Sequence, residues 1–270
     1  MATRVIDPSL GAAVTANNIY TRGLQGEVWK DFDFVQAQTD PSYGYFKLYR
    51  WDEWTDISSS TSNPWATVTE VSQGTTNRID GTSTRTGFTS QLEVDLEATP
   101  SAGYGHNIQF KPAGIYATSG IKCYFDIMVS TATISTGPQF FVGFSDVDTT
   151  IFGSNILTTG YKIGFKAETS ATVYMCSGNN AVPTAATTSP KTLVDAATTT
   201  SGAELTRLGF AFEPGGSQVW SVDGTRKASD LASSTLPTGA VICPSIVFQA
   251  GGSVRSKLNV PYMAVGYKFQ

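Results

Sequence analysis

The sequence has little of the side-chain chemistry on which most enzymes and metal sites depend. His106 is the only histidine among 270 residues, which excludes metal sites with two histidines and the H-E-x-x-H motif of metalloproteases. The chain also lacks a G-x-S-x-G nucleophile elbow and a G-x-x-x-x-G-K-S/T phosphate loop. Because Ile108 and Phe110 after it mark the start of a strand, we expect His106 to lie on the surface or at a strand edge. We expect no cofactor.

Cysteine is also scarce, and the spacing of the cysteines does not indicate disulfide bonds. The three cysteines, Cys123, Cys176 and Cys243, are odd in number, widely separated and without a C-x-x-C pair. Neither a disulfide framework nor a thiolate zinc site is therefore indicated, and no metal site is expected. We expect free thiols packed inside a protein that folds in a reducing compartment.

Charge and long apolar runs are both limited. Charged residues make up 15% of the chain, the net charge is −4, and no block of lysine or arginine occurs, so we expect neither nucleic acid nor membrane as a partner. The longest apolar runs, 140–144 and 241–248, are far shorter than the roughly 18 residues that a membrane span requires. Asp7 and Pro8 interrupt any apolar core near the N-terminus, so we expect no signal peptide.

Strand and turn formers dominate what is present, with 36 threonines, 27 serines and 26 glycines. From Ile121 to Val129, apolar residues alternate with Lys122, Tyr124, Asp126 and Met128, the pattern of a half-buried antiparallel strand. Similar runs occur at 140–144, 161–165, 171–175, 207–212, 218–222, 241–249 and 259–269. The sequence therefore predicts an all-β protein, with one antiparallel β-sandwich over residues 26–270 after an extended N-terminal arm of residues 1–25.

An aliphatic-Gly-Phe triplet occurs three times, with its glycine at Gly143, Gly164 and Gly209. The unequal gaps between the triplets argue against a tandem repeat. We expect these glycines to mark bulges or close contacts between strands.

Seven aromatic residues fall between Tyr43 and Trp65. The tryptophans Trp51, Trp54 and Trp65 form a candidate contact surface, either a platform on which sugars stack or a patch for subunit contact. The alternative is that this stretch supplies sandwich core and the end of a hairpin.

Acidic and apolar residues alternate from Glu93 to Glu97. On a strand this spacing places Glu93, Asp95 and Glu97 on one face, with Val94 and Leu96 on the other. The spacing resembles the E-x-D-x-E strand of the lichenase and laminarinase class of endo-β-glucanases. That resemblance implies Glu93 as nucleophile, Glu97 as acid/base and Asp95 as the residue that tunes them. The structural alternative, which we favour, is a half-exposed strand with one solvated acidic face.

The second half of the chain resembles the concanavalin-like jelly roll of lectin-like and laminin-G-like sandwiches. The resemblance rests on a Pro-Gly-Gly hairpin at 214–216, a strand ending in Val222-Asp223-Gly224, and a Leu-Pro turn that leads into an aliphatic strand. It implies a jelly-roll fold and leaves the function open.

In its Thr/Ser/Gly-rich acidic composition and its arm, the chain also resembles tailed-bacteriophage virion proteins, especially capsid decoration (cement) proteins and fibre domains. This implies a non-catalytic structural protein that is made in the host cytoplasm and located on the capsid surface of the virion. There a homotrimer would bind and stabilise the lattice of the major capsid protein. One alternative is the receptor-recognition module of a fibre, which would bind a host glycan through Trp51, Trp54 and Trp65. A second alternative is an endo-β-glucanase.

Overall fold

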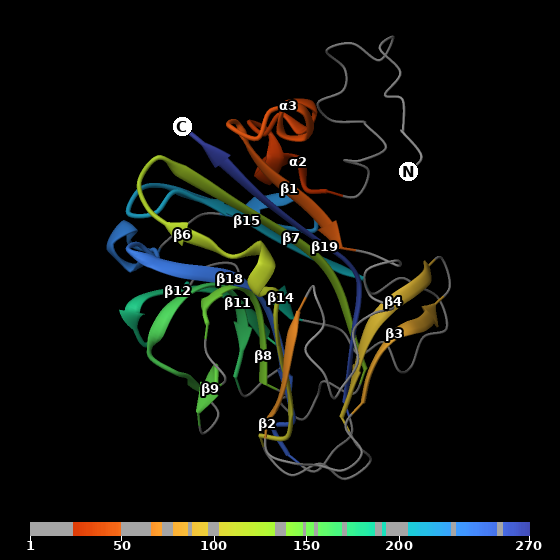
Figure 1. Ribbon diagram of the computed structural model, residues 1–270. Helices are drawn as coiled ribbons and strands as arrows, with labels where there is room; N and C mark the ends of the chain where they lie inside the picture. Colours follow the sequence, from red (N-terminus) through yellow and green to blue (C-terminus); the bar gives the residue numbers. More distant parts are fainter. Residues whose placement is uncertain are drawn as a thin grey trace.

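The computed structural model shows two antiparallel β-sheets packed face to face, with two short helices outside one of them (Figure 1). It describes residues 24–49, 66–71, 78–85, 88–96, 103–132, 139–147, 150–153, 156–168, 172–186, 191–192, 205–227, 231–252 and 256–270. The predicted antiparallel sandwich is confirmed. Among these residues, no helix is long and apolar enough to cross a membrane.

Within the described ranges, sheet A has eight strands. Their order is β17 (Thr225–Lys227), β16 (Gln218–Val222), β15 (Thr206–Phe212), β7 (Ile121–Ala132), β19 (Lys257–Phe269), β4 (Phe88–Asp95) and β3 (Arg78–Arg85), and β1 (Gly44–Tyr49) pairs with β19. The helices α2 (Gly26–Trp29) and α3 (Phe34–Thr39) lie on its outer side (Figure 1).

Sheet B has nine strands in the part of the chain that the structure describes. Their order is β13 (Thr184–Ala185), β12 (Thr172–Ala181), β11 (Gly160–Ala167), β8 (Gln139–Asp146), β18 (Ala240–Gln249), β5 (Gly105–Gln109) and β2 (Thr67–Val71); β14 (Lys191–Thr192) pairs with β12, and β6 (Ile115–Ala117) with β18. The remaining elements are the hairpin of β9 (Phe152–Gly153) and β10 (Ile156–Leu157) and the 3-10 helices η2 (Lys111–Ala113) and η4 (Ser233–Thr235).

The main core fills the space between the two sheets, as the alternating strands predict. Phe125 and Phe210 of sheet A stack with ring centroids 5.3 Å apart, and Phe144 of sheet B meets both of them. The expectation that β7 is half-buried is wrong. Its other face carries Tyr124 and Asp126, which are also fully buried, because α2 packs over them.

Leu24 and Gln25, at the end of the segment assigned to the arm, lie within the packed part of the molecule. Gln25 is buried and bonded to β7, and Leu24 packs against the apolar cluster under the helices. The rest of that arm, residues 1–23, lies outside the described residues.

The glycines of the repeated triplet are close contacts, as expected. Gly143 of β8 and Gly164 of β11 are directly opposite each other. A Cβ atom on Gly143 would lie 2.2 Å from the carbonyl oxygen of Ile163. Gly209 makes room for another side chain, since a Cβ atom there would lie 2.5 Å from the amide nitrogen of Gln25.

Candidate functional site

The acidic residues of β4 lie on the outer face of sheet A, as the alternation predicts. Val94 and Leu96 are fully buried in the core between the sheets, and Glu93 and Asp95 point the opposite way. Glu97, the third residue of the motif, lies outside the described residues.

The expectation of a solvated acidic face is wrong, because Glu93 and Asp95 are only 8% and 6% exposed. Strand β19 places Lys257 directly opposite Asp95. The Lys257 Nζ atom lies 3.0 Å from Glu93 Oε1 and 2.9 Å from Asp95 Oδ2. Burial disfavours the charged amine, but the hydrogen bonds to Asp95 and Glu93 outweigh it and raise the pKa of Lys257. One ammonium group, on a side chain that is 32% exposed, thus joins two nearly buried carboxylates in an ionic cluster.

The tryptophans Trp51, Trp54 and Trp65 of the candidate contact surface lie outside the described residues. The aromatic residues just before them divide between three environments. Tyr49 is buried in the sandwich core against Phe110, and Phe46 packs under the helices against Trp29. Tyr45 is 37% exposed and stacks on the ring of Tyr267.

His106 is not at the surface or at a strand edge, so that expectation is wrong. Strand β5 lies between β18 and β2, and His106 is fully buried opposite Phe248. Its parity with Ile108, a core residue, is the sequence signal that places it inside. Within the described part of the chain, neither ring nitrogen has a hydrogen-bond partner. Burial lowers the pKa of His106 to about 4.

Replacing His106 by leucine is expected to stabilise the protein by about 1–2 kcal/mol at pH 7, because it removes two buried polar atoms that lack partners. Since the folded pKa lies below that of the unfolded chain, the wild type also loses stability as the pH falls from about 6.5 toward 4. Urea unfolding at pH 7 and pH 5 measures both effects. An unchanged or lower midpoint for His106→Leu at pH 7 would show that the imidazole is not an energetic cost.

The three cysteines are free and buried, as expected. Burial raises the thiol pKa of Cys176 to about 12 and that of Cys243 to about 11. It also raises the thiol pKa of Cys123. Because the thiolate is the reactive form, these side chains serve packing rather than nucleophilic chemistry.

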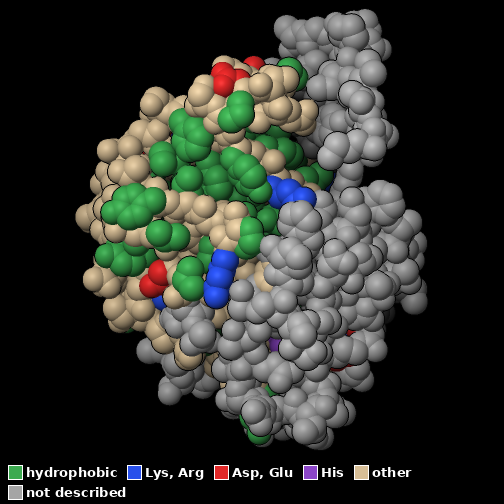
Figure 2. Space-filling model, in the orientation of Figure 1, with side chains coloured by type: hydrophobic (Ala, Val, Ile, Leu, Met, Phe, Trp, Pro, Cys, Tyr) green, Lys and Arg blue, Asp and Glu red, His purple; other side chains and the backbone are tan. Residues whose placement is uncertain are grey.

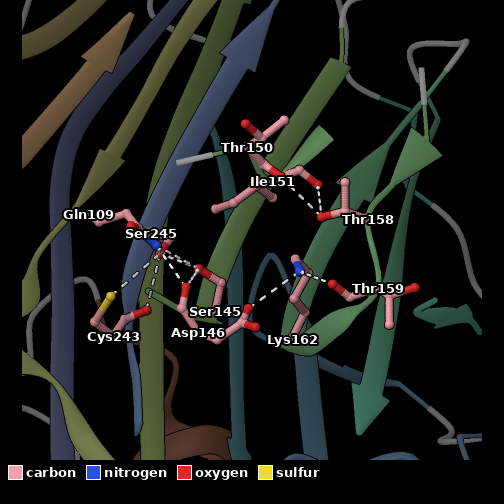
Figure 3. A network of polar contacts seen from close by, with 10 residues as sticks. All are labelled: Gln109, Ser145, Asp146, Thr150, Ile151, Thr158, Thr159, Lys162, Cys243 and Ser245. Carbon is pink, nitrogen blue, oxygen red and sulfur yellow. Dashed lines mark hydrogen bonds and ion pairs between the residues drawn. The ribbon is translucent and has the colours of Figure 1, made fainter. Parts of the chain in front are cut away.

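A polar network that the sequence did not point to crosses the outer face of sheet B (Figure 3). Gln109 of β5 donates from Nε2 to the hydroxyl of Ser145 at 3.0 Å, and Ser145 lies 2.8 Å from the hydroxyl of Ser245. Nearby, the fully buried Lys162 lies 3.3 Å from both Asp146 Oδ1 and the carbonyl oxygen of Thr159.

The hydrogen bonds of this network join neighbouring strands, so the network stabilises sheet B. Beside it the hairpin segment packs Ile151, Phe152 and Leu157 onto the sheet residues Phe141 and Val247, so this part of the face is covered. Among the residues that the structure describes, no group of three or more His, Cys, Asp or Glu side chains could hold a metal ion. The sequence signal that could have revealed this network is a serine in or next to an apolar run, as at Ser145 and Ser245.

A second buried polar centre lies on the outer face of sheet A. Asp126 Oδ2 accepts hydrogen bonds from the backbone N–H of Gln25 at 2.6 Å and from the indole N–H of Trp29 at 3.2 Å. Asp126 Oδ1 lies 3.4 Å from the Tyr262 hydroxyl and 3.5 Å from the Gln25 amide nitrogen. These contacts join the N-terminal helices to the middle of the sheet.

Apolar side chains reach the surface at one end of sheet B. Tyr116 of β6 and Val241 of β18 are directly opposite each other and are 55% and 52% exposed. Val147 directly follows Asp146, which is opposite Ile242, so it continues the same row. Val182, which is also exposed, follows Ala181, and Ala181 pairs with Gly160 at the same end of the sheet. Figure 2 shows apolar side chains at the surface over β6 and the start of β18.

The sandwich is shared with proteins of known structure. The lectin I of Ulex europaeus is 10% identical, with a TM-score of 0.52 over 84% of this chain and 99% of its own. Peanut lectin is 11% identical, with a TM-score of 0.51 over 84% of this chain and 98% of its own. This chain has a lectin-like jelly-roll fold. This confirms the jelly-roll fold that the second half of the sequence predicted.

A third similar structure comes from work on endo-acting O-glycanases of human gut bacteria. It is 12% identical, with a TM-score of 0.50 over 83% of this chain and 98% of its own. No protein-family model and no curated protein sequence matches the chain. At these identities the similarity shows the fold, and any binding function has to be argued from the residues of this chain.

Proposed function

We propose that this protein is a non-catalytic structural protein of a bacteriophage virion, which assembles as a homotrimer on the capsid surface and binds the major capsid protein. The observation that carries the proposal is the exposed apolar row of Tyr116, Val241 and Val147. The virion setting itself comes from the resemblance in composition and from the segment before residue 24.

The row has the character of a protein-contact surface. Four of the seven large apolar side chains that are exposed in the described residues, Tyr116, Val147, Val182 and Val241, gather at this end of sheet B. Single exposed apolar residues are ordinary, whereas neighbouring ones on adjacent strands form a continuous patch. A capsid lattice offers many copies of one site, so modest contacts per subunit add up by avidity.

The ionic cluster of Glu93, Asp95 and Lys257 supports the non-catalytic part of the proposal. A retaining glucanase needs one carboxylate free to attack the sugar and a second carboxyl group that can donate a proton. Here Glu93 and Asp95 share one ammonium partner and are nearly inaccessible to a polymer. We therefore propose that these acids stabilise sheet A, with no hydrolysis of β-glucan.

Val241→Asp is expected to weaken binding to purified capsids by about 30- to 100-fold, because it places an unpaired charge in an apolar contact. The matched control is Val35→Asp. Val35 is an exposed apolar residue on α3, outside the opposite sheet, and its replacement is expected to leave binding unchanged. Sedimentation of the protein with capsids that lack it measures both variants.

Equal binding by wild type and Val241→Asp would show that the row is not part of the capsid interface.

A glycan array distinguishes the fibre alternative. Specific binding to a host glycan that is lost in Trp54→Ala would replace the capsid proposal with a receptor-recognition role.

A further inference from the structure

The N-terminal segment of residues 24–39, here called the strap, has its own apolar cluster. Val28, Trp29, Phe32 and Phe34 pack against Tyr124, Ala211 and Ala264 on the outer face of sheet A. The sandwich core lies on the other face of the same sheet. Because the two clusters are separated by the sheet, the strap can open while the sandwich keeps its core.

The polar centre of the strap contact is the Asp126 carboxylate, which is fully buried. Its two oxygens are not equally satisfied. Oδ2 has close N–H donors from Gln25 and Trp29, whereas Oδ1 has, among the described residues, two longer contacts, to Tyr262 and to the Gln25 amide. The Tyr262 hydroxyl donates to the charged Oδ1 atom. Once Oδ1 is protonated, this hydrogen bond can reverse, so that Asp126 donates to the Tyr262 oxygen while the contacts of Oδ2 stay in place.

We propose that Asp126 acts as a proton-sensitive clasp, which holds the strap to sheet A more tightly when its Oδ1 atom is protonated than when the carboxylate is charged. The proposal is independent of the capsid-binding function, since it concerns the opening of residues 24–39 in the free protein.

The surroundings of Asp126 supply no direct counter-ion. Arg207 of β15 acts on it through its charge, without an ion pair between them among the described residues. Asp223 accepts a hydrogen bond from the Arg207 backbone, beside the turn whose Gly224 N–H donates to Gln25. Burial raises the pKa of Tyr262 well above its usual value, so this phenol stays neutral.

The two aspartates of the strap have partners other than Asp126, because Asp31 pairs with Lys122 and Asp33 caps α3. Glu27, Lys30 and Asp31 line a cleft at the edge of the sheet, where Asp31 forms an ion pair with Lys122 at 2.6 Å. Burial raises the pKa of Asp126 to about 7, while the donors on Gln25 and Trp29 and the charge of Arg207 act in the opposite direction. The docked strap therefore takes up a proton near neutral pH.

The sign of the effect follows from linkage. In the open state Asp126 is solvated and titrates near its ordinary pKa of about 4. Because the docked state has the higher pKa, docking is favoured at acidic pH and this advantage is lost as the pH rises through about 7. Between pH 5.5 and pH 8, opening of the strap is expected to become about thirtyfold more frequent.

The test is hydrogen exchange of the full chain, with the peptide of residues 24–39 followed at pH 5.5 and pH 8 and corrected for intrinsic exchange. The wild type is expected to lose about thirtyfold protection at pH 8. Asp126→Asn is expected to show the same protection at both pH values. The matched control Asp31→Asn, in the exposed ion pair of the same strap, is expected to keep the wild-type pH dependence.

Unchanged wild-type protection, or the same pH dependence in Asp126→Asn, would overturn the proposal. If Asp126→Asn opens the strap at both pH values, Tyr262→Phe replaces it as the test variant. Removing the hydroxyl that donates to the charged Oδ1 atom should raise the pH at which the strap loosens. An unshifted or lowered transition in Tyr262→Phe would contradict protonation at Oδ1.

Discussion

Lys257→Met should destabilise the protein by about 1.5–3 kcal/mol at pH 7, because two nearly buried carboxylates lose the hydrogen bonds of the cation that they share. Denaturant unfolding at pH 7, relative to wild type, measures the effect.

Lys268→Met is the matched control on the same strand. Lys268 donates to the backbone carbonyl of Asp31 at 3.0 Å, on the exposed side of the molecule, so its replacement should cost less than about 1 kcal/mol. The triple variant Glu93→Gln, Asp95→Asn, Lys257→Met should recover most of the stability. A Lys257→Met protein as stable as wild type would show that the cluster is solvated, and it would reopen the hypothesis that these acids are available for catalysis.

Trp29→Ala should weaken docking of the strap by about 4 kcal/mol, as expected for removal of a buried tryptophan. The Trp29 ring is stacked on Tyr124 at 5.2 Å and meets Phe32, Phe34 and Phe46 at 5.3–5.5 Å. Its indole N–H also contributes to the contacts of Asp126. Hydrogen exchange of residues 24–39 should rise strongly in the variant, while the strands of the sandwich stay protected.

Phe269→Ala is a suitable control, because Phe269 is an aromatic residue of sheet A that is 38% exposed. It should leave exchange in the strap nearly unchanged. Loss of protection throughout both sheets in Trp29→Ala would mean that the strap and the sandwich fold as one unit, contrary to the separate clusters seen in the structure.

The strands could be predicted from the sequence because alternation of apolar residues is a local signal. The same signal correctly separated Glu93 and Asp95 from Val94. It could not show what covers the polar face. Lys257 is 162 residues beyond Asp95 in the chain, and only the pairing of β4 with β19 brings the two together.

The burial of Asp126 was hidden for a related reason. The helix α2 that covers it has four residues, too few for a helical period to be seen against the surrounding strands. His106 is different, because its parity with Ile108 is a local signal for an inward side chain, which the expectation of a surface position did not use.

The proposed role on the capsid is tested most directly by counting copies of this protein in purified virions by quantitative mass spectrometry. A decoration protein that binds the major capsid lattice should be present in numbers comparable with the major capsid protein. A count of only a few copies per particle, or the absence of the protein from virions, would contradict the proposal.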